Sequence, residues 1–398
     1  VHALQTFAVI ENACLGSVRG TKMKTQLQAT AALIAFIAAT APVSAQVKGD
    51  KIPGSYVCVF KKEAVARGNV QSEANRIAQE NGGQINHIYT VALRGFAANL
   101  SPRALESLLA KNPNIAYCEQ DQVMAVAQFV ANGKPSGGGT TTTVQPPQET
   151  PWGIARVGGG ISGTFATAWV IDSGIDLKHP DLNVDTIRSS SFLGRRTTPQ
   201  DQNGHGTHVA GTIAARDNLI GVVGVAPGAP VVSVRVLDGS GSGTTTGVIA
   251  GVDYVARYGR TGDVASMSLG GGISPTLDNA VVVAAAGGVR FAIAAGNANA
   301  NANNYSPARA NGPNVFTVSA FGVGDQRASY SNFANPPIDY AEPGSAIKST
   351  WLNGGYNTIS GTSMAAPHLA GLLLQGAVRS GGNVAGDPDG VPDVIGVK

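Results

Sequence analysis

Cysteine is scarce in this chain, and charge is low. Only three cysteines occur among 398 residues, and the chain after Cys118 has none. The larger part of the protein therefore needs neither a disulfide nor a thiolate metal site. Charged residues make up 13% of the chain, the net charge is +3, and no cluster of Lys and Arg is interleaved with aromatic residues. This composition argues against nucleic acid as a partner.

Length and glycine content indicate several folded units with many tight turns. A chain of 398 residues with 43% hydrophobic residues is long enough for two or three units. Its 52 glycines exceed the average usage of about 7%. Many backbone positions must therefore be tight turns or close approaches.

The segment from Met23 has the order of a secretory signal. Lys24 follows the methionine, an apolar stretch covers residues 29–41, and small residues at 43–45 end it. This order predicts a signal peptide over 23–45 and a secreted, extracellular protein. A membrane anchor is the alternative, but it needs roughly 20 apolar residues. Residues 1–22 precede the first methionine, so we interpret them as an upstream artefact, with a genuine long leader as the alternative.

Residues 46–127 are predicted to form a small domain. Strands are expected at 56–60, 87–91, 95–100 and 115–118, and helices at 70–80 and from Pro102, with Ser101 as N-cap. The order βαββαβ predicts a ferredoxin-like α+β sandwich. The next segment, 128–149, is rich in Gly, Thr, Pro and Gln, cannot bury a core, and is predicted to be a flexible linker.

Residues 150–398 alternate apolar strands with helical stretches. Strands are expected at 168–171, 231–236, 264–269, 291–295 and 315–320, with helices at 246–258, 277–285 and 364–378. Most strands are continuous apolar runs, as in a parallel sheet covered on both faces. We expect a doubly wound, mainly parallel α/β domain, whose sites lie beyond the carboxyl ends of strands. Asp172, Asp238 and Asn297 all follow strands.

Three residue types in one order point to nucleophilic catalysis. A serine hydroxyl needs an imidazole to remove its proton, and the imidazole needs a carboxylate to fix its tautomer. Asp172, His205 and Ser363 supply these groups in the order Asp, His, Ser. Taken alone, each residue has a plainer interpretation. Asp172 could be a turn residue, His205 a metal ligand together with His208, and Ser363 a helix cap. The combination is far more specific.

The motifs around these residues resemble the subtilisin-like serine peptidases, particularly the proteinase K branch. The resemblance rests on PWGIAR at 151–156, HGTHVAGT at 205–212, VLDGSGSG at 236–243, SMSLGGG at 266–272, AAGN at 294–297, NYSPA at 304–308 and GTSMAAPH at 361–368. Residues 46–127 are similar to the inhibitory propeptide of the same family. The resemblance thus implies a zymogen that processes itself and whose propeptide serves as intramolecular chaperone and inhibitor.

Carried over by resemblance, Asp172 orients the base, His205 is the general base and acid, and Ser363 is the nucleophile. Asn297 would supply the oxyanion-hole side chain beside the backbone N–H of Ser363. An extended substrate would pair with two edges and place one side chain in a pocket. The edges would be formed by Gly241, Ser242 and Gly243 and by Ser268, Leu269, Gly270 and Gly271, and the pocket would be completed by Ala294, Ala295 and Gly296.

The pocket residues are small and uncharged, which favours broad cleavage after apolar and aromatic residues. No Asp or Glu occurs between Asp278 and Asp325, and a buried Arg or Lys without a partner would cost several kcal/mol. The expected substrates are peptides and proteins. Separately, we expect a monomer.

No cofactor is expected for the chemistry, although structural calcium is an option. The calcium-ligand aspartate expected after residue 320 is replaced around Phe321 and Gly322. The tail has carboxylates at Asp387, Asp389 and Asp393, which could bind calcium or form a solvated turn. The identity of any metal ligands stays open.

A serine esterase and an inactive binding module are the two rival functions. A serine esterase of the α/β-hydrolase type needs G-x-S-x-G with Asp and His after the serine, whereas Ala365 replaces the last glycine here. A catalytically inactive binding or adhesion module on the same fold would lack a triad residue or Asn297. The three triad residues and Asn297 are all present.

Cys58 and Cys118 fall on the first and last strands of the small domain. These strands are antiparallel neighbours in a ferredoxin-like sheet, so a disulfide is compatible with the fold, and secretion permits it. Two buried free thiols are the alternative, since the register is not fixed by the pattern.

Overall fold

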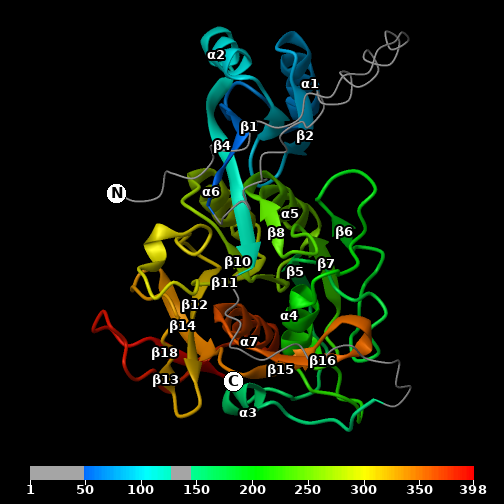
Figure 1. Ribbon diagram of the computed structural model, residues 1–398, viewed down its shortest axis with the longest axis vertical. Coiled ribbons are helices and arrows are strands. Elements are labelled where there is room, and N and C mark those ends of the chain that lie inside the picture. The colour runs from blue at the N-terminus through cyan, green and yellow to red at the C-terminus, as the bar shows by residue number, and fades with distance from the viewer. Residues whose placement is uncertain (1–48, 127–144) are drawn as a thin grey trace, which may run out of the picture. The chain divides into compact units, whose positions relative to one another are not determined.

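The computed structural model describes residues 49–126 and 145–398. The predicted signal peptide (23–45), residues 1–22 and most of the linker at 128–149 lie outside this part. Within the described residues, no helix is long and apolar enough to cross a membrane. A small antiparallel sheet is followed along the chain by a large, mainly parallel one (Figure 1).

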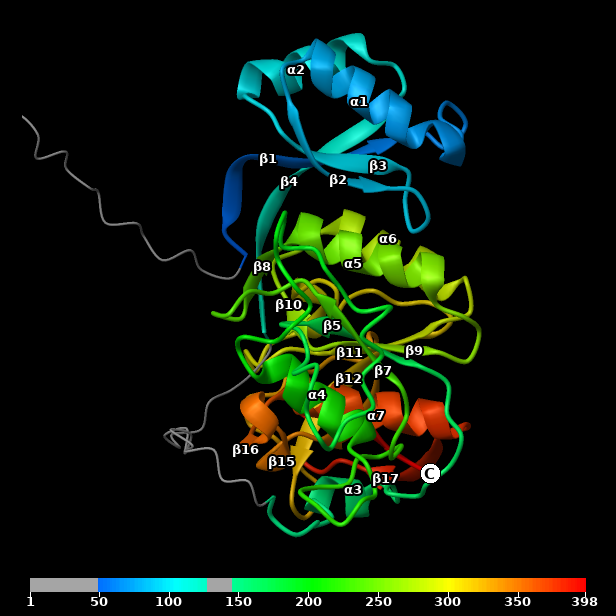
Figure 2. The ribbon, with the colours of Figure 1, turned by 90° about the vertical axis from the view of Figure 1, so that its right-hand side faces the viewer.

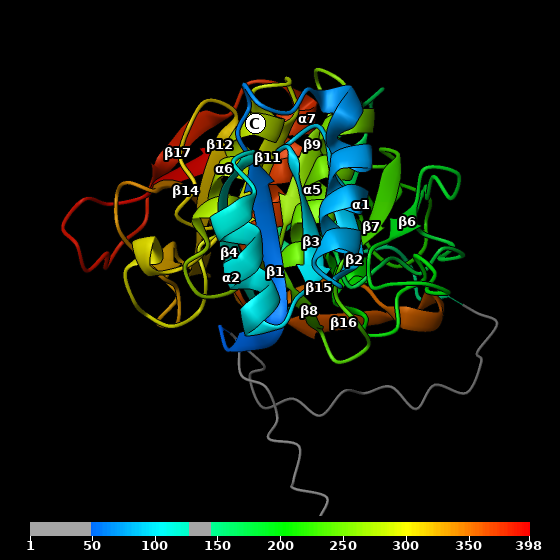
Figure 3. The same ribbon diagram turned by 90° about the horizontal axis from the view of Figure 1, so that it is seen from above.

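The small domain has the predicted βαββαβ order. Its strands pair antiparallel in the order β4-β1-β3-β2, and the two helices lie over one face of the sheet (Figure 3). The elements are β1 (Lys51–Phe60), α1 (Val70–Glu80), β2 (Gln84–Tyr89), β3 (Gly95–Asn99), α2 (Pro102–Lys111) and β4 (Ile115–Val126), with a 3-10 turn at Arg67–Asn69. The Ser101 side chain accepts from the backbone N–H of Ala104 and caps α2, as predicted.

Strand β1 begins at Lys51, earlier than the predicted 56. The far ends of two other strands differ from the prediction because of contacts made far along the chain. Strand β2 ends at Tyr89, because the N–H groups of the next three residues turn to the carboxylate of Asp253. Strand β4 runs to Val126 and not to residue 118, because its second half pairs with β8 (Ser242–Thr244) and β10 (Leu269–Gly270) of the large domain.

The large domain has the predicted doubly wound architecture. Its sheet has the order β17-β18-β14-β12-β11-β9-β5-β7-β6, with β13 paired to β12. All neighbouring pairs are parallel except those made by β13 and β17. The strands are β5 (Ala168–Asp172), β6 (Ser190–Ser191), β7 (Val231–Arg235), β9 (Val264–Met267), β11 (Arg290–Ala294), β12 (Val315–Gly322), β13 (Gln326–Arg327), β14 (Ile338–Pro343), β17 (Arg379–Asn383) and β18 (Val394–Val397).

Helices cover both faces of this sheet (Figure 2). Helices α5 (Thr245–Tyr258) and α6 (Pro275–Ala285) cover one face, and α4 (His205–Ala214) and α7 (Thr362–Gln375) cover the other. Successive residues of β5 serve both layers: Trp169 and Ile171 pack with α5 and α6, whereas Ala168 and Val170 pack with α4 and α7. This explains why the central strands are continuous apolar runs. A short helix α3 (Trp152–Arg156), 3-10 turns at Ala302–Asn304 and Leu352–Gly354, and a hairpin of β15 (Ile347–Thr350) and β16 (Tyr356–Ile359) complete the domain.

The tail at 379–398, for which no element was predicted, forms the last two strands of the sheet. Strand β18 joins β14 in parallel and β17 turns back along it. Ile395 packs with Phe321 and Ala341 in a small core of its own. The tail is thus part of the sheet.

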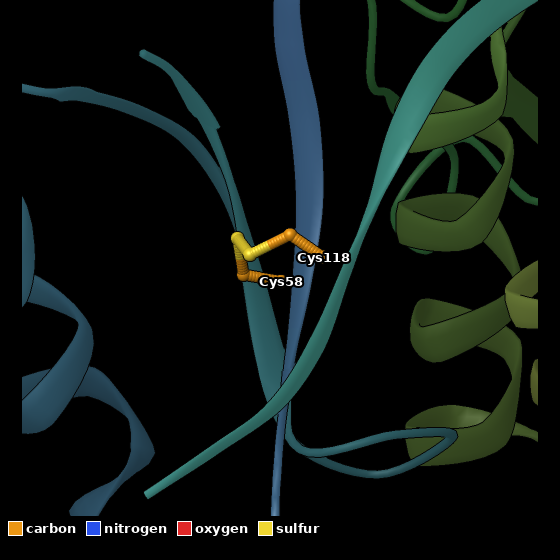
Figure 4. Close-up of a disulfide and its surroundings, with 2 residues drawn as sticks. All are labelled: Cys58 and Cys118. Carbon is orange, nitrogen blue, oxygen red and sulfur yellow. A yellow bond between two sulfur atoms is a disulfide. The ribbon is translucent and has the colours of Figure 1, made fainter. Parts of the chain in front are cut away.

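Cys58 and Cys118 form a disulfide (Figure 4). The two residues stand directly opposite each other in the antiparallel pair of β1 and β4, and their Cα atoms are 4.0 Å apart. The prediction that the first and last strands are antiparallel neighbours is confirmed. Of the two alternatives, a disulfide or two free thiols, the structure has the disulfide.

Glu342 on β14 is a fully buried acid that the fold leaves without hydrogen bonds. Neither carboxyl oxygen has a partner, and burial raises the pKa of Glu342 well above its ordinary value of 4.5, although the charge of Arg156 opposes this. The folded protein therefore holds a proton here at pH values where the unfolded chain has lost it.

We predict that Glu342→Gln removes a pH-dependent loss of stability. Because the folded-state pKa is the higher one, the stability linked to this proton is complete below pH 4.5 and falls by up to about 1.4 kcal/mol per pH unit as pH rises toward the folded-state pKa. The uncharged amide does not titrate. Urea unfolding of both proteins in the Ser363→Ala background, at about pH 5 and about pH 8, measures the difference. Equal pH slopes for the two proteins would contradict the assignment.

Candidate active site

Asp172 and His205 form a buried pair at the carboxyl edge of the sheet. Asp172 ends β5 and His205 begins α4, and both are fully buried. The Nδ1–H of His205 donates to Oδ1 of Asp172 at 2.8 Å. This bond fixes the tautomer that leaves Nε2 as the proton-accepting nitrogen of the ring.

A second carboxylate, Asp201, fixes the backbone around this pair. It accepts hydrogen bonds from the Ser173 hydroxyl at 3.0 Å and from the Thr207 hydroxyl at 2.6 Å. The Ser173 hydroxyl in turn accepts from the backbone N–H of Gly206 at 3.0 Å. A Cβ atom on Gly206 would lie 2.1 Å from the carbonyl oxygen of Gly174 and 3.1 Å from Cβ of Asp172. Only glycine therefore lets α4 begin so close to β5.

Ser363 lies in the first turn of α7 and is fully buried. Its hydroxyl donates to the carbonyl oxygen of Ser268 at 3.1 Å, and the Ser268 hydroxyl donates to the carbonyl of Ser363 at 2.9 Å. Nε2 of His205 has no hydrogen-bond partner, so the serine hydroxyl is directed at Ser268 in this state. For proton transfer, the Ser363 hydroxyl must turn toward Nε2 of His205. Hydrogen bonds between catalytic groups commonly tighten only when substrate is bound.

Asn297 is held in one orientation by Thr362, the residue before Ser363. The side-chain oxygen of Asn297 accepts from the backbone N–H of Thr362 at 2.9 Å and from its hydroxyl at 2.8 Å. The Thr362 hydroxyl also accepts from the N–H of Gly296 at 3.0 Å. With the oxygen engaged in this way, the donor end of the amide points away from Thr362.

The two predicted edge segments pair with the chain's own residues 123–126. Val123, Met124 and Ala125 pair antiparallel with β8, and Ala125 and Val126 pair antiparallel with β10. The N–H of Val126 also donates to the carbonyl of Gly241 at 3.0 Å. An extended chain thus fits between these edges as an added strand.

Glycines make room for this strand and for its side chains. A Cβ atom on Gly271 would lie 2.4 Å from the sulfur of Met124, and one on Gly241 would lie 3.2 Å from Cγ2 of Val126. Met124 is fully buried between the two domains. The edges are therefore shaped for a chain that carries a large apolar side chain at this position.

The remaining predicted site residues lie at the end of β11. Ala294 and Ala295 are buried. Gly296 has a φ of +103°, and a Cβ atom on it would lie 2.5 Å from Nδ2 of Asn332. The wall they form is small, apolar and uncharged.

His208 belongs to the core of the large domain. It is fully buried, its Nε2–H donates to the carbonyl of Ile347 at 3.0 Å, and burial lowers its pKa to about 3. A neutral histidine bound to a backbone carbonyl agrees with the expected packing role.

The carboxylates considered for calcium do not form a cluster of ligands in the described residues. Phe321, where the resemblance expects a ligand, is buried in the core. In the tail, Asp387 and Asp393 each have a buried oxygen without a hydrogen bond, but the charge of Arg327 already acts on both carboxylates. Across residues 49–126 and 145–398, no group of three or more His, Cys, Asp or Glu side chains is placed to hold a metal ion.

Three carboxylates that hold the small domain against the large one were missed from the sequence. Glu119 accepts from the backbone N–H of Thr276 at 3.1 Å and from its hydroxyl at 2.6 Å. Asp121 does the same for Thr246 at 3.1 and 2.8 Å. Asp253 accepts from the N–H groups after β2, as described above. The sequence feature that could have revealed Glu119 and Asp121 is their spacing of two residues, which places both on one face of a strand. In the structure they face the starts of α6 and α5.

Comparison with known proteins agrees with this geometry. Residues 168–377 match the model of the subtilase family, and residues 55–127 match that of the peptidase inhibitor I9. The chain is 38% identical to the alkaline serine exoprotease A of Vibrio alginolyticus over 81% of its own length, and spans 60% of that protein. It is 34% identical to proteinase R of Parengyodontium album, with 82% of this chain and 80% of that protein covered.

Among solved structures, the chain resembles a cold-adapted subtilisin-like serine proteinase. The two share 40% sequence identity with a TM-score of 0.53, and the match covers 61% of this chain and 96% of the other. The fold class predicted from the sequence is thereby confirmed.

We predict that Thr362→Val lowers the turnover of peptide substrates through the orientation of Asn297. The substitution removes one of the two donors to the amide oxygen, so the amide can flip. We expect kcat to fall by roughly tenfold at a similar KM, less than the 10²–10³ that outright loss of an oxyanion donor costs in a subtilisin. Thr362→Ser keeps the hydroxyl and is the matched control. A valine variant with wild-type kcat would refute this positioning role.

Proposed function

Because this chain belongs to the subtilase family of serine peptidases, we propose that it is a secreted endopeptidase made as a self-processing zymogen. The chain is a serine endopeptidase with an inhibitory propeptide domain, and such enzymes need no cofactor for catalysis. The observation that carries the proposal is the buried Asp172–His205 pair at the end of β5, on the same sheet edge as the start of α7.

In the proposed mechanism, Ser363 attacks the scissile carbonyl and His205 takes its proton. Asp172 stabilises the imidazolium that forms, and His205 then returns the proton to the leaving amine. The negative charge on the carbonyl oxygen is met by the Asn297 amide and by the Ser363 backbone N–H, at the positive end of α7.

We propose that the first bond cut is in the precursor itself, after Ala127. Strand β4 occupies the cleft with Val126 opposite Leu269 and Ala125 opposite Gly270. In this register the next position along β10 is Ser268, whose carbonyl accepts the hydroxyl of Ser363. We propose that a chain continued in the same register would bring its next carbonyl to the nucleophile.

We predict that Ser363→Ala leaves the fold intact and stops processing. Loss of the nucleophile costs on the order of 10⁶ in kcat in a subtilisin, so the full precursor should accumulate in a host without other proteases. Wild-type protein should yield a fragment that begins at Gln128 on N-terminal sequencing. Added wild-type enzyme should restore cleavage of the variant, which controls for misfolding. A variant that matures normally by itself would exclude Ser363 as the nucleophile, and an unprocessed, inactive wild type would favour the binding module.

We further propose a broad specificity with apolar and aromatic residues before the scissile bond. Support comes from the small, uncharged wall of Ala294, Ala295 and Gly296 and from backbone pairing at the edges, which does not depend on sequence. The buried Met124 indicates that a second apolar side chain, three residues before the proposed P1 residue, also contributes.

We predict that peptides with Phe or Leu before the scissile bond are cleaved better than those with Arg or Lys. A charged side chain would be desolvated there without a partner, whereas apolar residues should differ among themselves by only about 1–3 kcal/mol. Measurement of kcat/KM over peptides that differ only at this position tests the prediction. Tenfold preference for Arg or Lys would show that the pocket is elsewhere.

Secretion and a monomeric state are also part of the proposal. Secretion is supported by the signal-like order at 23–45 and by the disulfide, which oxidising compartments permit. Nucleic acid and, after signal removal, membranes are not expected partners.

A further inference from the structure

The Cys58–Cys118 disulfide lies on the strand that closes the active-site cleft. Cys118 is in the first half of β4, and residues 123–126 of the same strand fill the gap between β8 and β10. The disulfide joins this strand to its neighbour β1 in the small sheet (Figure 4). The bond therefore connects the fold of the propeptide to its inhibitory end.

The contacts that hold the propeptide to the peptidase follow Cys118 directly. Glu119 and Asp121, one and three residues further, accept hydrogen bonds from the starts of α6 and α5. These carboxylates reach their partners only while β4 keeps its place in the small sheet. Loss of that sheet would release the two carboxylates and the strand end together.

Away from its contacts with the large domain, the small domain has one small core of its own. Its own core consists of eleven buried apolar residues around Phe60, Ile77 and Phe96. A domain of this size gains only modest stability from one core. A disulfide across 60 residues of sequence contributes a stabilisation comparable to that core, by restricting the unfolded chain.

The peptidase domain cannot respond to thiols. The chain after Cys118 has no cysteine, and the third cysteine, Cys14, lies ahead of the predicted signal peptide. Cys58 is fully buried, whereas Cys118 is partly exposed, so a small thiol can approach the bond from the Cys118 side.

We propose that this disulfide is a redox-sensitive control on the lifetime of the inhibited state, an inference that rests on the proposed zymogen. While the bond is intact, the propeptide stays folded and keeps β4 in the cleft, even after its own peptide bond to the peptidase is cut. A dithiol opens the bond: the Sγ–Sγ bond breaks, two protons and two electrons pass to the cysteines, and the dithiol becomes a cyclic disulfide. The reduced propeptide unfolds more often, becomes a substrate, and is digested.

The test measures the lag before peptidase activity appears in folded wild-type precursor, with and without dithiothreitol. Reduction should shorten the lag at least roughly tenfold, since a long-loop disulfide is worth several factors of ten in a folding equilibrium. Activity of the matured enzyme should not change. Alkylation and mass measurement should show that Cys58 and Cys118 are reduced when the lag shortens.

A C58S/C118S variant is the matched control and should show a short lag that dithiothreitol does not alter. If that variant fails to fold, reduction of wild-type protein that has already folded still tests the proposal. An unchanged lag with the bond open, or an equal response to reductant in C58S/C118S, would overturn it.

A separate arm does not depend on catalysis. In the Ser363→Ala precursor, an added protease should cut within residues 49–126 at least roughly tenfold faster after reduction, because cleavage requires opening of the domain. Equal rates in both redox states would refute the control. Failure of the proposed function, by contrast, would appear as an inactive wild type in every condition.

Discussion

The addition of one strand to two open edges is the constraint on which the rest of this molecule depends. Strands β8 and β10 each present unpaired backbone groups toward the same gap, and β4 fills it with antiparallel pairing on both sides. Open edges of this kind bind any extended chain. In the structure, residues 123–126 of β4 cover these edges, and in the proposed zymogen they keep substrates away until the propeptide is removed. Gly271 is adapted to this strand, because a Cβ atom there would lie 2.4 Å from the sulfur of Met124.

The buried polar groups of the site show how hydrogen bonds offset the desolvation of groups needed for catalysis. Asp172, His205 and Asp201 all lie in the core, where an isolated charge would be expensive. Each is hydrogen bonded, and the bonds converge on the turn from β5 to Ser173 and on the start of α4. Glu342 is the contrast: it is equally buried but has no such partner, and burial accordingly raises its pKa.

Local sequence patterns predicted most of the fold but few of the contacts between the domains. The apolar runs at 168–171 and 231–236 and the cap at Ser101 depend on neighbours in sequence or on burial, and they were found. The end of β2 and the extension of β4 depend on Asp253 and on β8 and β10, more than a hundred residues away. The motif residues around Ser363 were named from a resemblance, whereas the role of Thr362 beside Asn297 becomes visible only from their distance.

The helix starts that face the small domain bear on how the peptidase of the proposed zymogen would persist after the propeptide leaves. The backbone N–H groups in the first turn of α6 have no partner within the helix. Pro275 has no N–H, the Ser274 hydroxyl accepts from the N–H of Leu277, and Glu119 accepts from that of Thr276. The first turn of α5 repeats the pattern, with Thr244 accepting from Gly247 and Asp121 from Thr246.

Each helix therefore keeps its own cap when the propeptide leaves, and water replaces one carboxylate at an exposed helix start. The propeptide carboxylates add binding energy through the helix dipoles without being required for the helices themselves. Dissociation then depends on whether β4 holds both acids and its strand end in place at once. That is a property of the small sheet, in which β4 is covalently joined to its neighbour β1.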